Sequence, residues 1–202
     1  MIIIIIIFII FYIIGILPTF IQNIISFMIH FIKSYGSTRP KKRTFNFDRI
    51  TSNIYLGTQP QSIDDIHKLT KLGINNILSI NYNWELHISA DSNIYNNINR
   101  WQIQTPDFQS LTLDDLHKSC RIIDDVIKQN KCIYIHCNAG KGRSAQVVVC
   151  YLLGKMYKYR YTIDDIFKYV KKKRPSICNS INSIIRAKGL KIRIYKYLYL
   201  DL

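Results

Sequence analysis

From residue 45 onward, short apolar segments alternate with longer segments in which apolar residues recur every three or four positions. The short segments have the length and composition of strands, and they lie at residues 45–56 (two short strands), 74–80, 100–104 and 131–136. Strands that alternate with helices form a parallel sheet covered on both faces. The sequence therefore predicts an α/β fold with a parallel or mixed central sheet flanked by helices.

The helical segments carry N-terminal capping signals. Ser62, Thr112 and Thr162 each stand three positions before an aspartate, a pattern typical of a helix start. The predicted helices begin at Ser62 and Thr112 and span residues 144–156, 162–173 and about 179–198. The chain of 202 residues fits one such domain, which we place at residues 45–202.

Residues 1–31 contain no Lys, Arg, Asp or Glu, and residues 2–17 are almost entirely Ile, Phe, Tyr and Leu. A helix over 2–17 is about 24 Å long, somewhat shorter than the hydrocarbon core of a bilayer. No basic start or small-residue cleavage site marks a signal peptide. We predict a hydrophobic membrane anchor at residues 1–32, as a spanning or interfacial helix; the alternative is an isoleucine tract packed on the domain.

A basic stretch at residues 33–44 follows, with its positive residues at Lys33, Arg39, Lys41, Lys42 and Arg43. Gly36 and Pro40 interrupt this stretch, as in a linker. Positive residues beside a membrane helix stay on the side where the chain is made and attract anionic headgroups. We expect a juxtamembrane linker, with a domain that faces the cytosol or a mitochondrial matrix; a solvated linker is the alternative.

The net charge of +15, from 28 Lys and Arg against 13 Asp and Glu, suits an anionic partner. A nucleic-acid binder is one interpretation, but the chain has no DNA- or RNA-binding motif, so we do not expect that partner. The five cysteines form no CxxC pair, which indicates a reducing compartment without a disulfide framework. Four of them are predicted to be small buried apolar residues.

The fifth, Cys137, begins a glycine-rich loop between the strand at 131–136 and the helix at 144–156, in the stretch HCNAGKGRS. Glycines at 140 and 142 allow successive N–H groups to point inward, and the following helix directs its positive end to the same point. This cradle suits a phosphate. The predicted phosphate-binding residues are Asn138, Ala139, Gly140, Lys141, Gly142 and Arg143.

A thiol in such a field loses its proton easily, so we predict that Cys137 is a nucleophile. Arg143 would offer a planar fork to two phosphoryl oxygens. Ser144 would donate a hydrogen bond to the thiolate when the phosphoenzyme breaks down. His136 is expected to orient the loop by hydrogen bonding rather than to act as a base.

A phosphomonoester leaving group needs a proton, so a second element must supply an acid. Asp107 lies in the stretch TPDF, in a predicted loop between a strand and a capped helix. Asp114 and Asp115 lie at the start of that helix, where capping explains them. We therefore predict that Asp107 is the general acid.

The stretch HCNAGKGRS matches the pattern HCxxGxxR[ST]. Through this match the chain resembles the dual-specificity branch of the cysteine-based protein tyrosine phosphatases. Within that branch it is similar to the mitochondrial PTP-like phosphatidylglycerophosphatases, through FNFDRITSNIYLGTQP, LGINNILSINYNWE, QTPDFQSLTLDDL, YIHCNAGKGRS and KKRPS. The resemblance implies a nucleophile at Cys137, a phosphate-binding arginine at Arg143 and a general acid at Asp107, without metal or cofactor. Asn138 stands where that family often has lysine, and Trp84 replaces a tyrosine before the retained Glu85.

We therefore expect a membrane-anchored phosphatase that hydrolyses a lipid phosphomonoester, from phosphatidylglycerophosphate to phosphatidylglycerol in cardiolipin biosynthesis. The expected partner is an anionic phospholipid in the mitochondrial inner membrane, with the domain in the matrix; the endoplasmic reticulum with a cytosolic domain is the alternative. Two other activities fit the site, a dual-specificity protein phosphatase and a phosphoinositide phosphatase. A catalytically inactive binding module would normally lack the Cys137 or Arg143 side chain.

Overall fold

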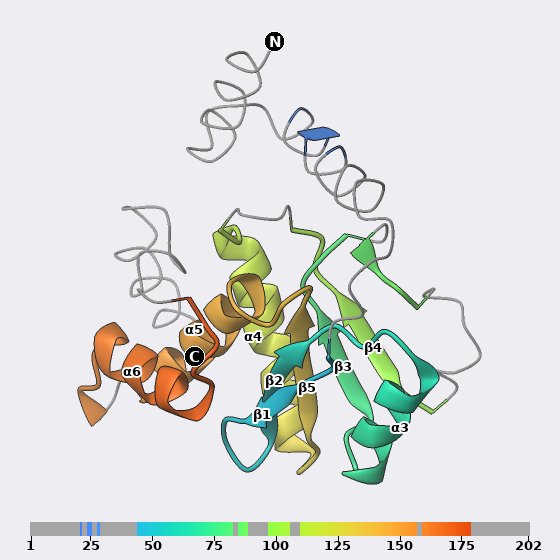
Figure 1. Cartoon of the computed structure of the whole chain (residues 1–202). Helices are drawn as coiled ribbons and strands as arrows, with labels where there is room; N and C mark the ends of the chain where they lie inside the picture. The colour runs from blue at the N-terminus through green and yellow to red at the C-terminus, as the bar shows by residue number, and fades with distance from the viewer. Residues whose placement is uncertain are drawn as a thin grey trace. The chain divides into compact units, whose positions relative to one another are not determined.

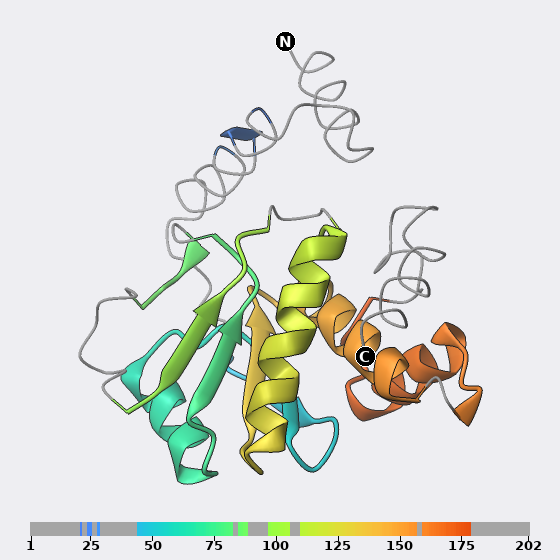
Figure 2. The same cartoon turned by 180° about the vertical axis from the view of Figure 1, so that it is seen from behind.

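A computed structural model of the chain describes residues 44–82, 85–88, 97–105, 110–156 and 159–178, with Ile21, Ile24, Ile25 and Met28. The chain divides into two units, Met1–Thr44 with Pro106–Gln109, and Phe45–Thr105 with Ser110–Leu202. Every strand and helix named below belongs to the second unit. Figures 1 and 2 show these elements from opposite sides. Most of the predicted anchor, most of the predicted linker and the predicted helix at about 179–198 lie outside the described residues.

The sheet is mixed, as predicted, and its five strands lie in the order β1-β2-β5-β3-β4. The strands are β1 (Phe47–Arg49), β2 (Ile54–Thr58), β3 (Asn76–Ser79), β4 (Asn99–Gln102) and β5 (Ile133–Cys137). Only the β1–β2 pair is antiparallel, and β2–β5, β5–β3 and β3–β4 are parallel. Because parallel strands end at one edge, the chain leaves β2, β5, β3 and β4 on the same side of the domain.

Three of the helices begin at the predicted caps. The helices are α3 (Ile63–Lys71), α4 (Leu113–Lys128), α5 (Arg143–Met156) and α6 (Ile163–Lys173). Ser62, Thr112 and Thr162 each accept a hydrogen bond from the backbone N–H of the aspartate three positions on, which satisfies an otherwise unpaired N–H group at each helix start. The capping role predicted for Asp115 is confirmed, since its N–H bonds Thr112.

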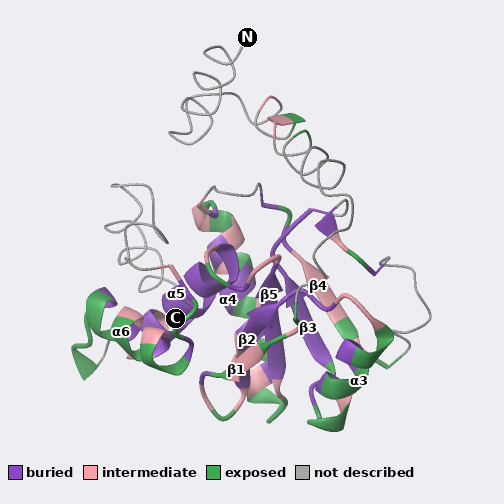
Figure 3. Cartoon of the chain, viewed as in Figure 1, coloured by how far each residue is buried: buried purple, intermediate pink, exposed green. Residues whose placement is uncertain are grey.

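Side chains of β5 alternate between the two faces of the sheet. Ile133, Ile135 and Cys137 belong to the large core beneath α4, α5 and α6, whereas Tyr134 belongs to a smaller core with Ile66 and Leu69 of α3. Both faces of the sheet are therefore covered, and the outer faces of α3 and α6 stay exposed (Figure 3). The two-residue period of a strand thus places the Cys137 side chain on the α5 face.

All five cysteines are free, as expected for a chain without disulfides. Cys120 and Cys150 are buried apolar residues of the large core, as predicted. The same prediction is wrong for Cys132 and Cys178, which are half-buried because they pack at the margins of the smaller and the larger core, respectively. Among the described residues, no helix is long and apolar enough to span a membrane.

Candidate active site

The loop between β5 and α5 makes its tightest turn at Gly140. This residue has a φ of +64°, and a Cβ atom there would lie 2.2 Å from the carbonyl oxygen of Gly57. That oxygen belongs to the backbone of β2 and cannot move aside. The loop can therefore curl against β2 only with glycine at this position.

Arg174, the C-terminal cap of α6, holds the same turn from the outside. Its guanidinium is buried and donates from Nε to the Gly140 carbonyl at 2.9 Å. Its two other nitrogens donate to Asp48 at 2.7 Å and to the Asn46 side chain at 2.9 Å. Arg174 thus links the loop to β1 and to the residue before it. The Cys178 N–H adds a bond to the Lys141 carbonyl at 3.1 Å.

The Cys137 thiol lies at the carboxyl end of β5 and is only 4% exposed. Burial opposes its ionisation, but the charge of Arg143, the Ser144 hydroxyl and the backbone N–H groups of Ser144 and Gly140 outweigh burial and lower the pKa of Cys137 below its ordinary value. The Ser144 hydroxyl donates to Sγ at 3.2 Å. These groups stabilise a thiolate, the reactive form of cysteine.

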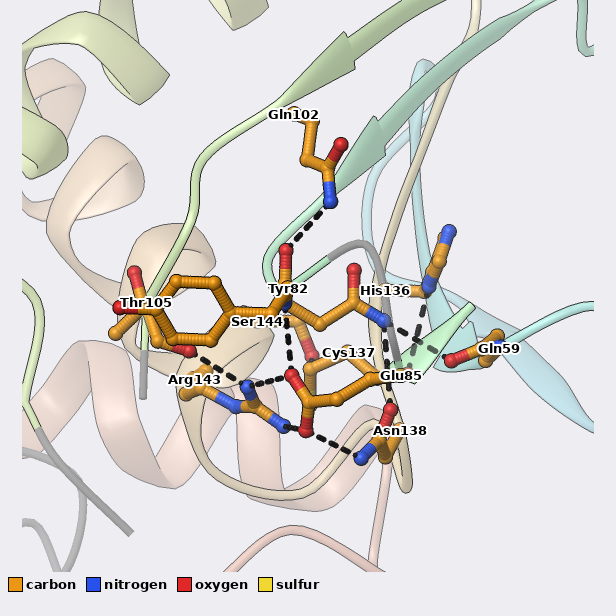
Figure 4. A network of polar contacts seen from close by, with 11 residues as sticks. Gln59, Tyr82, Glu85, Gln102, Thr105, His136, Cys137, Asn138, Arg143 and Ser144 are labelled. Atoms are coloured by element: carbon orange, nitrogen blue, oxygen red, sulfur yellow. Dashed lines mark hydrogen bonds and ion pairs between the residues drawn. The ribbon is translucent and has the colours of Figure 1, made fainter. Parts of the chain in front are cut away.

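Arg143 begins α5 and forms a two-pronged ion pair with Glu85 (Figure 4). Nη1 donates to Oε2 at 2.8 Å and Nη2 to Oε1 at 3.0 Å, with both side chains buried. Nη1 also donates to the Thr105 carbonyl at 2.8 Å. The Glu85 carboxylate thus binds the edge of the guanidinium formed by Nη1 and Nη2. A phosphate would bind the other edge, formed by Nε and Nη2.

Asn138, directly after the nucleophile, donates from Nδ2 to Glu85 Oε1 at 2.7 Å. The Tyr82 N–H donates to the other carboxylate oxygen at 2.8 Å. With the two bonds from Arg143, the buried carboxylate has four donors, which compensates the loss of water around it. Sequence reasoning noted that Glu85 is retained but assigned it no partner.

His136 points to the face of the sheet opposite Cys137, and within the described part of the chain its ring makes no hydrogen bond to the thiol. Its Nε2 lies 2.9 Å from the Ser79 hydroxyl and its Nδ1 lies 3.4 Å from the Cys137 carbonyl. Burial lowers the pKa of His136 to about 3, so the ring is neutral. Because a carbonyl only accepts, Nδ1 carries the proton, and the ring orients the loop as predicted.

The structure thus brings Cys137, Arg143 and Ser144 together, with Ala139, Gly140, Lys141 and Gly142 in the connecting loop. Asp107 lies outside the described residues, and its role as general acid stays a prediction. Both flanks of the segment 106–109 bond to the first turn of α5: the Thr105 carbonyl to Arg143, and the Leu111 N–H to Gln146 Oε1 at 3.0 Å. Sequence reasoning did not identify Gln146.

A thiol with a lowered pKa and a buried arginine, on a glycine loop between a central parallel strand and a helix, define the site of a cysteine-dependent phosphatase. The model of the family "Dual specificity phosphatase, catalytic domain" matches residues 54–186. The chain belongs to this family.

Individual relatives carry several activities in their names. The chain is 32% identical over 132 residues to a putative tyrosine phosphatase of Invertebrate iridescent virus 6, covering 64% of this chain and 80% of the relative. It is 30% identical over 135 residues to dual specificity protein phosphatase 9 of Homo sapiens, covering 66% of this chain and 33% of the relative. It is 26% identical over 132 residues to phosphatidylglycerophosphate phosphatase PTPMT2 of Arabidopsis thaliana, covering 65% and 56%.

The chain therefore spans between about a third and just over half of the length of human phosphatase 9 and the plant relative. Among solved structures, PTPMT1 in complex with PI(5)P is 20% identical with a TM-score of 0.64, covering 75% of this chain and 97% of that one. Tk-PTP in its active form is also 20% identical, with a TM-score of 0.61 and coverage of 77% and 97%. These likenesses show the phosphatase fold.

Proposed function

We propose that the chain is a membrane-anchored lipid phosphatase that converts phosphatidylglycerophosphate to phosphatidylglycerol, a step of cardiolipin biosynthesis. The observation that carries the phosphatase activity is the stabilised Cys137 thiolate beside Arg143 on the loop 138–142. The lipid substrate is supported by the similarity to plant phosphatidylglycerophosphate phosphatases and by the net charge of +15.

In the first step, the Cys137 thiolate attacks the phosphorus atom, and the bond between phosphorus and the leaving oxygen breaks. Arg143 and the loop N–H groups hold the three equatorial oxygens as charge develops on them. Asp107 gives its proton to the leaving oxygen. The products are the dephosphorylated alcohol and a cysteinyl phosphate on Cys137.

In the second step, water attacks the cysteinyl phosphate and the phosphorus–sulfur bond breaks. The Asp107 carboxylate accepts the proton of the attacking water, and inorganic phosphate leaves. The Ser144 hydroxyl, 3.2 Å from Sγ, donates a hydrogen bond to the thiolate as it forms. This bond stabilises the departing thiolate.

A second candidate function is dephosphorylation of phosphotyrosine, phosphoserine or phosphothreonine in proteins. The relatives from human and iridescent virus carry protein or tyrosine phosphatase names and are somewhat more similar in sequence than the plant enzymes. Phosphoinositides are the third candidate substrate. The catalytic steps are the same for all three substrates.

The location we propose is the mitochondrial inner membrane, with residues 1–32 as anchor and the domain in the matrix. The endoplasmic reticulum membrane with a cytosolic domain is the alternative. Support comes from the charge-free segment 1–31 and the basic residues that follow it. Fractionation of cells that express the tagged chain distinguishes the two membranes.

Phosphate release by the full chain in detergent micelles tests the activity, with phosphatidylglycerophosphate, phosphoinositides and a phosphotyrosine peptide at equal concentrations. We expect the largest kcat/KM for phosphatidylglycerophosphate. Cys137→Ser is the matched control, since it removes the nucleophile and keeps the loop. A larger kcat/KM for the peptide would replace the lipid proposal with the protein phosphatase.

A further inference from the structure

Three carboxamide side chains follow three neighbouring strands at the carboxyl edge of the sheet. Gln59 comes directly after β2, Asn138 directly after β5, and Asn81 shortly after β3, in the sheet order β2-β5-β3. Asn81 Nδ2 donates to Gln59 Oε1 at 2.9 Å and to Asn138 Oδ1 at 3.3 Å. Gln59, Asn81 and Asn138 are called the amide ladder below; Gln59 and Asn138 are labelled in Figure 4.

The amide ladder ends on Glu85, because Asn138 Nδ2 donates to Glu85 Oε1 at 2.7 Å. That carboxylate only accepts hydrogen bonds, so it determines which way Asn138 faces. The Asn138 oxygen then requires a donor from Asn81. Because Asn81 thus turns its Nδ2 group toward Asn138, the same group also donates to Gln59, which must present its side-chain oxygen. One carboxylate therefore orients all three carboxamides.

This orientation leaves two buried polar atoms without a partner among the described residues, Gln59 Nε2 and Asn81 Oδ1. The two residues are only 2% and 0% exposed. Folded proteins leave few such atoms, because each one lowers stability. A buried polar arrangement kept at this cost is typical of a functional site.

We propose that the amide ladder is a positioning device for Arg143: it fixes Glu85, and the two-pronged ion pair with Glu85 then fixes the guanidinium for the phosphoryl group. Gln102 extends the support to β4 by donating to the Asn81 carbonyl at 2.7 Å. Gln59 ties the loop back to β2, since its N–H donates to the Asn138 carbonyl at 3.3 Å. The inference rests on the proposed phosphoenzyme reaction.

The ladder also gives Asn138 a role that lysine cannot fill. A lysine at this position can donate to Glu85, but it has no acceptor for Asn81. The chain thus has one charge fewer beside the phosphate and a continuous link from β2 to Glu85. Asn138 is a positioning residue through its side chain.

The test uses the full chain with Asn138→Ala and Asn138→Asp. Asn138→Ala removes the donor to Glu85, and Asn138→Asp also places a second carboxylate against it. The control is Asn76→Ala: Asn76 is a buried asparagine at the opposite end of β3 whose Nδ2 donates to the Cys132 carbonyl at 2.9 Å. Two readouts report on Arg143 without turnover. One is the dissociation constant of vanadate, measured by direct binding, and the other is the pH dependence of Cys137 alkylation by iodoacetate, followed on the Cys137 peptide.

We expect Asn138→Ala to weaken vanadate binding about tenfold and to shift Cys137 alkylation to higher pH, with a larger effect for Asn138→Asp. Asn76→Ala should lower the melting temperature and leave both readouts at wild-type values. In kinetics with phosphatidylglycerophosphate, kcat should fall while KM changes little, because the guanidinium acts mainly on the transition state.

Combining Asn138→Ala with Glu85→Gln decides whether the ladder acts through Glu85. If it does, the double variant is no worse than Glu85→Gln alone. Additive losses, or wild-type readouts for Asn138→Ala, overturn the inference. A wild-type chain that binds vanadate but releases no phosphate from any substrate overturns the proposed function instead, and the alkylation readout still tests the ladder.

Discussion

Arg174 donates from Nε to the main-chain carbonyl of Gly140 at 2.9 Å, so the residue that ends α6 holds the tightest turn of the phosphate loop. The two residues are 34 positions apart in the sequence. The contact explains why a basic residue directly before Pro175 is almost completely buried. It also makes α6 part of the support of the candidate active site.

Arg174→Met should lower the free energy of unfolding by about 3 kcal/mol, because the Gly140 carbonyl and the Asn46 side chain lose a charged donor. Vanadate affinity should fall as well, since the loop loses its outer support. Asp48→Asn is the control, because Asp48 is partly exposed and the asparagine oxygen can still accept the hydrogen bond from Arg174, so its cost should be smaller than that of Arg174→Met. Urea denaturation and vanadate titration measure both effects. Equal losses for the two variants would contradict the role of the Gly140 contact.

Gly140→Ala should lower the free energy of unfolding by more than about 3 kcal/mol, since its Cβ would lie 2.2 Å from a backbone oxygen of β2 in a left-handed conformation. Gly73→Ala is a matched control: Gly73 has a φ of +73° with nothing within 4 Å of the added Cβ. Its cost is that of the left-handed backbone alone, about 1–2 kcal/mol. Urea midpoints of the two variants compare these costs, and a Gly140→Ala midpoint equal to that of Gly73→Ala would exclude the clash.

The local features of the fold are predictable from the sequence because they depend on neighbouring residues. The caps at Ser62, Thr112 and Thr162 involve residues three positions away, and the core face of β5 follows from its two-residue period. Cys137, Arg143 and Ser144 lie on one strand-loop-helix connection. Their proximity can therefore be predicted without knowledge of contacts between distant parts of the sequence.

The supports of the site were not predictable in the same way. Glu85 reaches Arg143 across 58 positions and Arg174 reaches Asp48 across 126, and neither distance has a periodic signal. Arg174 also follows three lysines, a composition that is usually solvated. Asn81 and Asn138 are 57 positions apart with no periodic signal between them, so their link became visible only in the structure.

His136 should make stability depend on pH. Burial lowers the pKa of His136 to about 3, whereas an unfolded histidine titrates near pH 6.5. As the pH falls below about 6.5, the unfolded chain binds a proton that native His136 excludes, so the free energy of unfolding decreases by up to about 1.4 kcal/mol per pH unit.

Urea denaturation between about pH 7 and pH 5 measures this slope above the range where carboxylates titrate. His136→Gln should reduce this slope by up to about 1.4 kcal/mol per pH unit, which is the contribution of one proton. A His136→Gln variant with the wild-type slope would show that the ring is protonated in the native state.

Asp107→Asn should slow hydrolysis of an alkyl phosphate far more than that of an activated aryl phosphate, because only the poor leaving group needs the proton. The basic limb of the pH profile of kcat should also disappear. Asp115→Asn is the control, since Asp115 caps α4 with its N–H on Thr112. Steady-state kinetics on both substrates measure the ratio. An equal loss on both would indicate a structural role for Asp107.

The anchor predicted at residues 1–32 should keep the full chain in the membrane pellet after high-salt and alkaline washes. Insertion of apolar residues resists salt, whereas attraction of Lys41, Lys42 and Arg43 to headgroups is screened over about 8 Å at physiological ionic strength. Replacing these three residues with glutamine should therefore leave the pellet fraction unchanged. Ile10→Arg with Ile14→Arg places two charges in the apolar segment and should move the chain to the alkaline supernatant. If the unchanged chain is itself recovered in that supernatant, the segment lies on the membrane surface as an interfacial helix, and the domain is held there by charge.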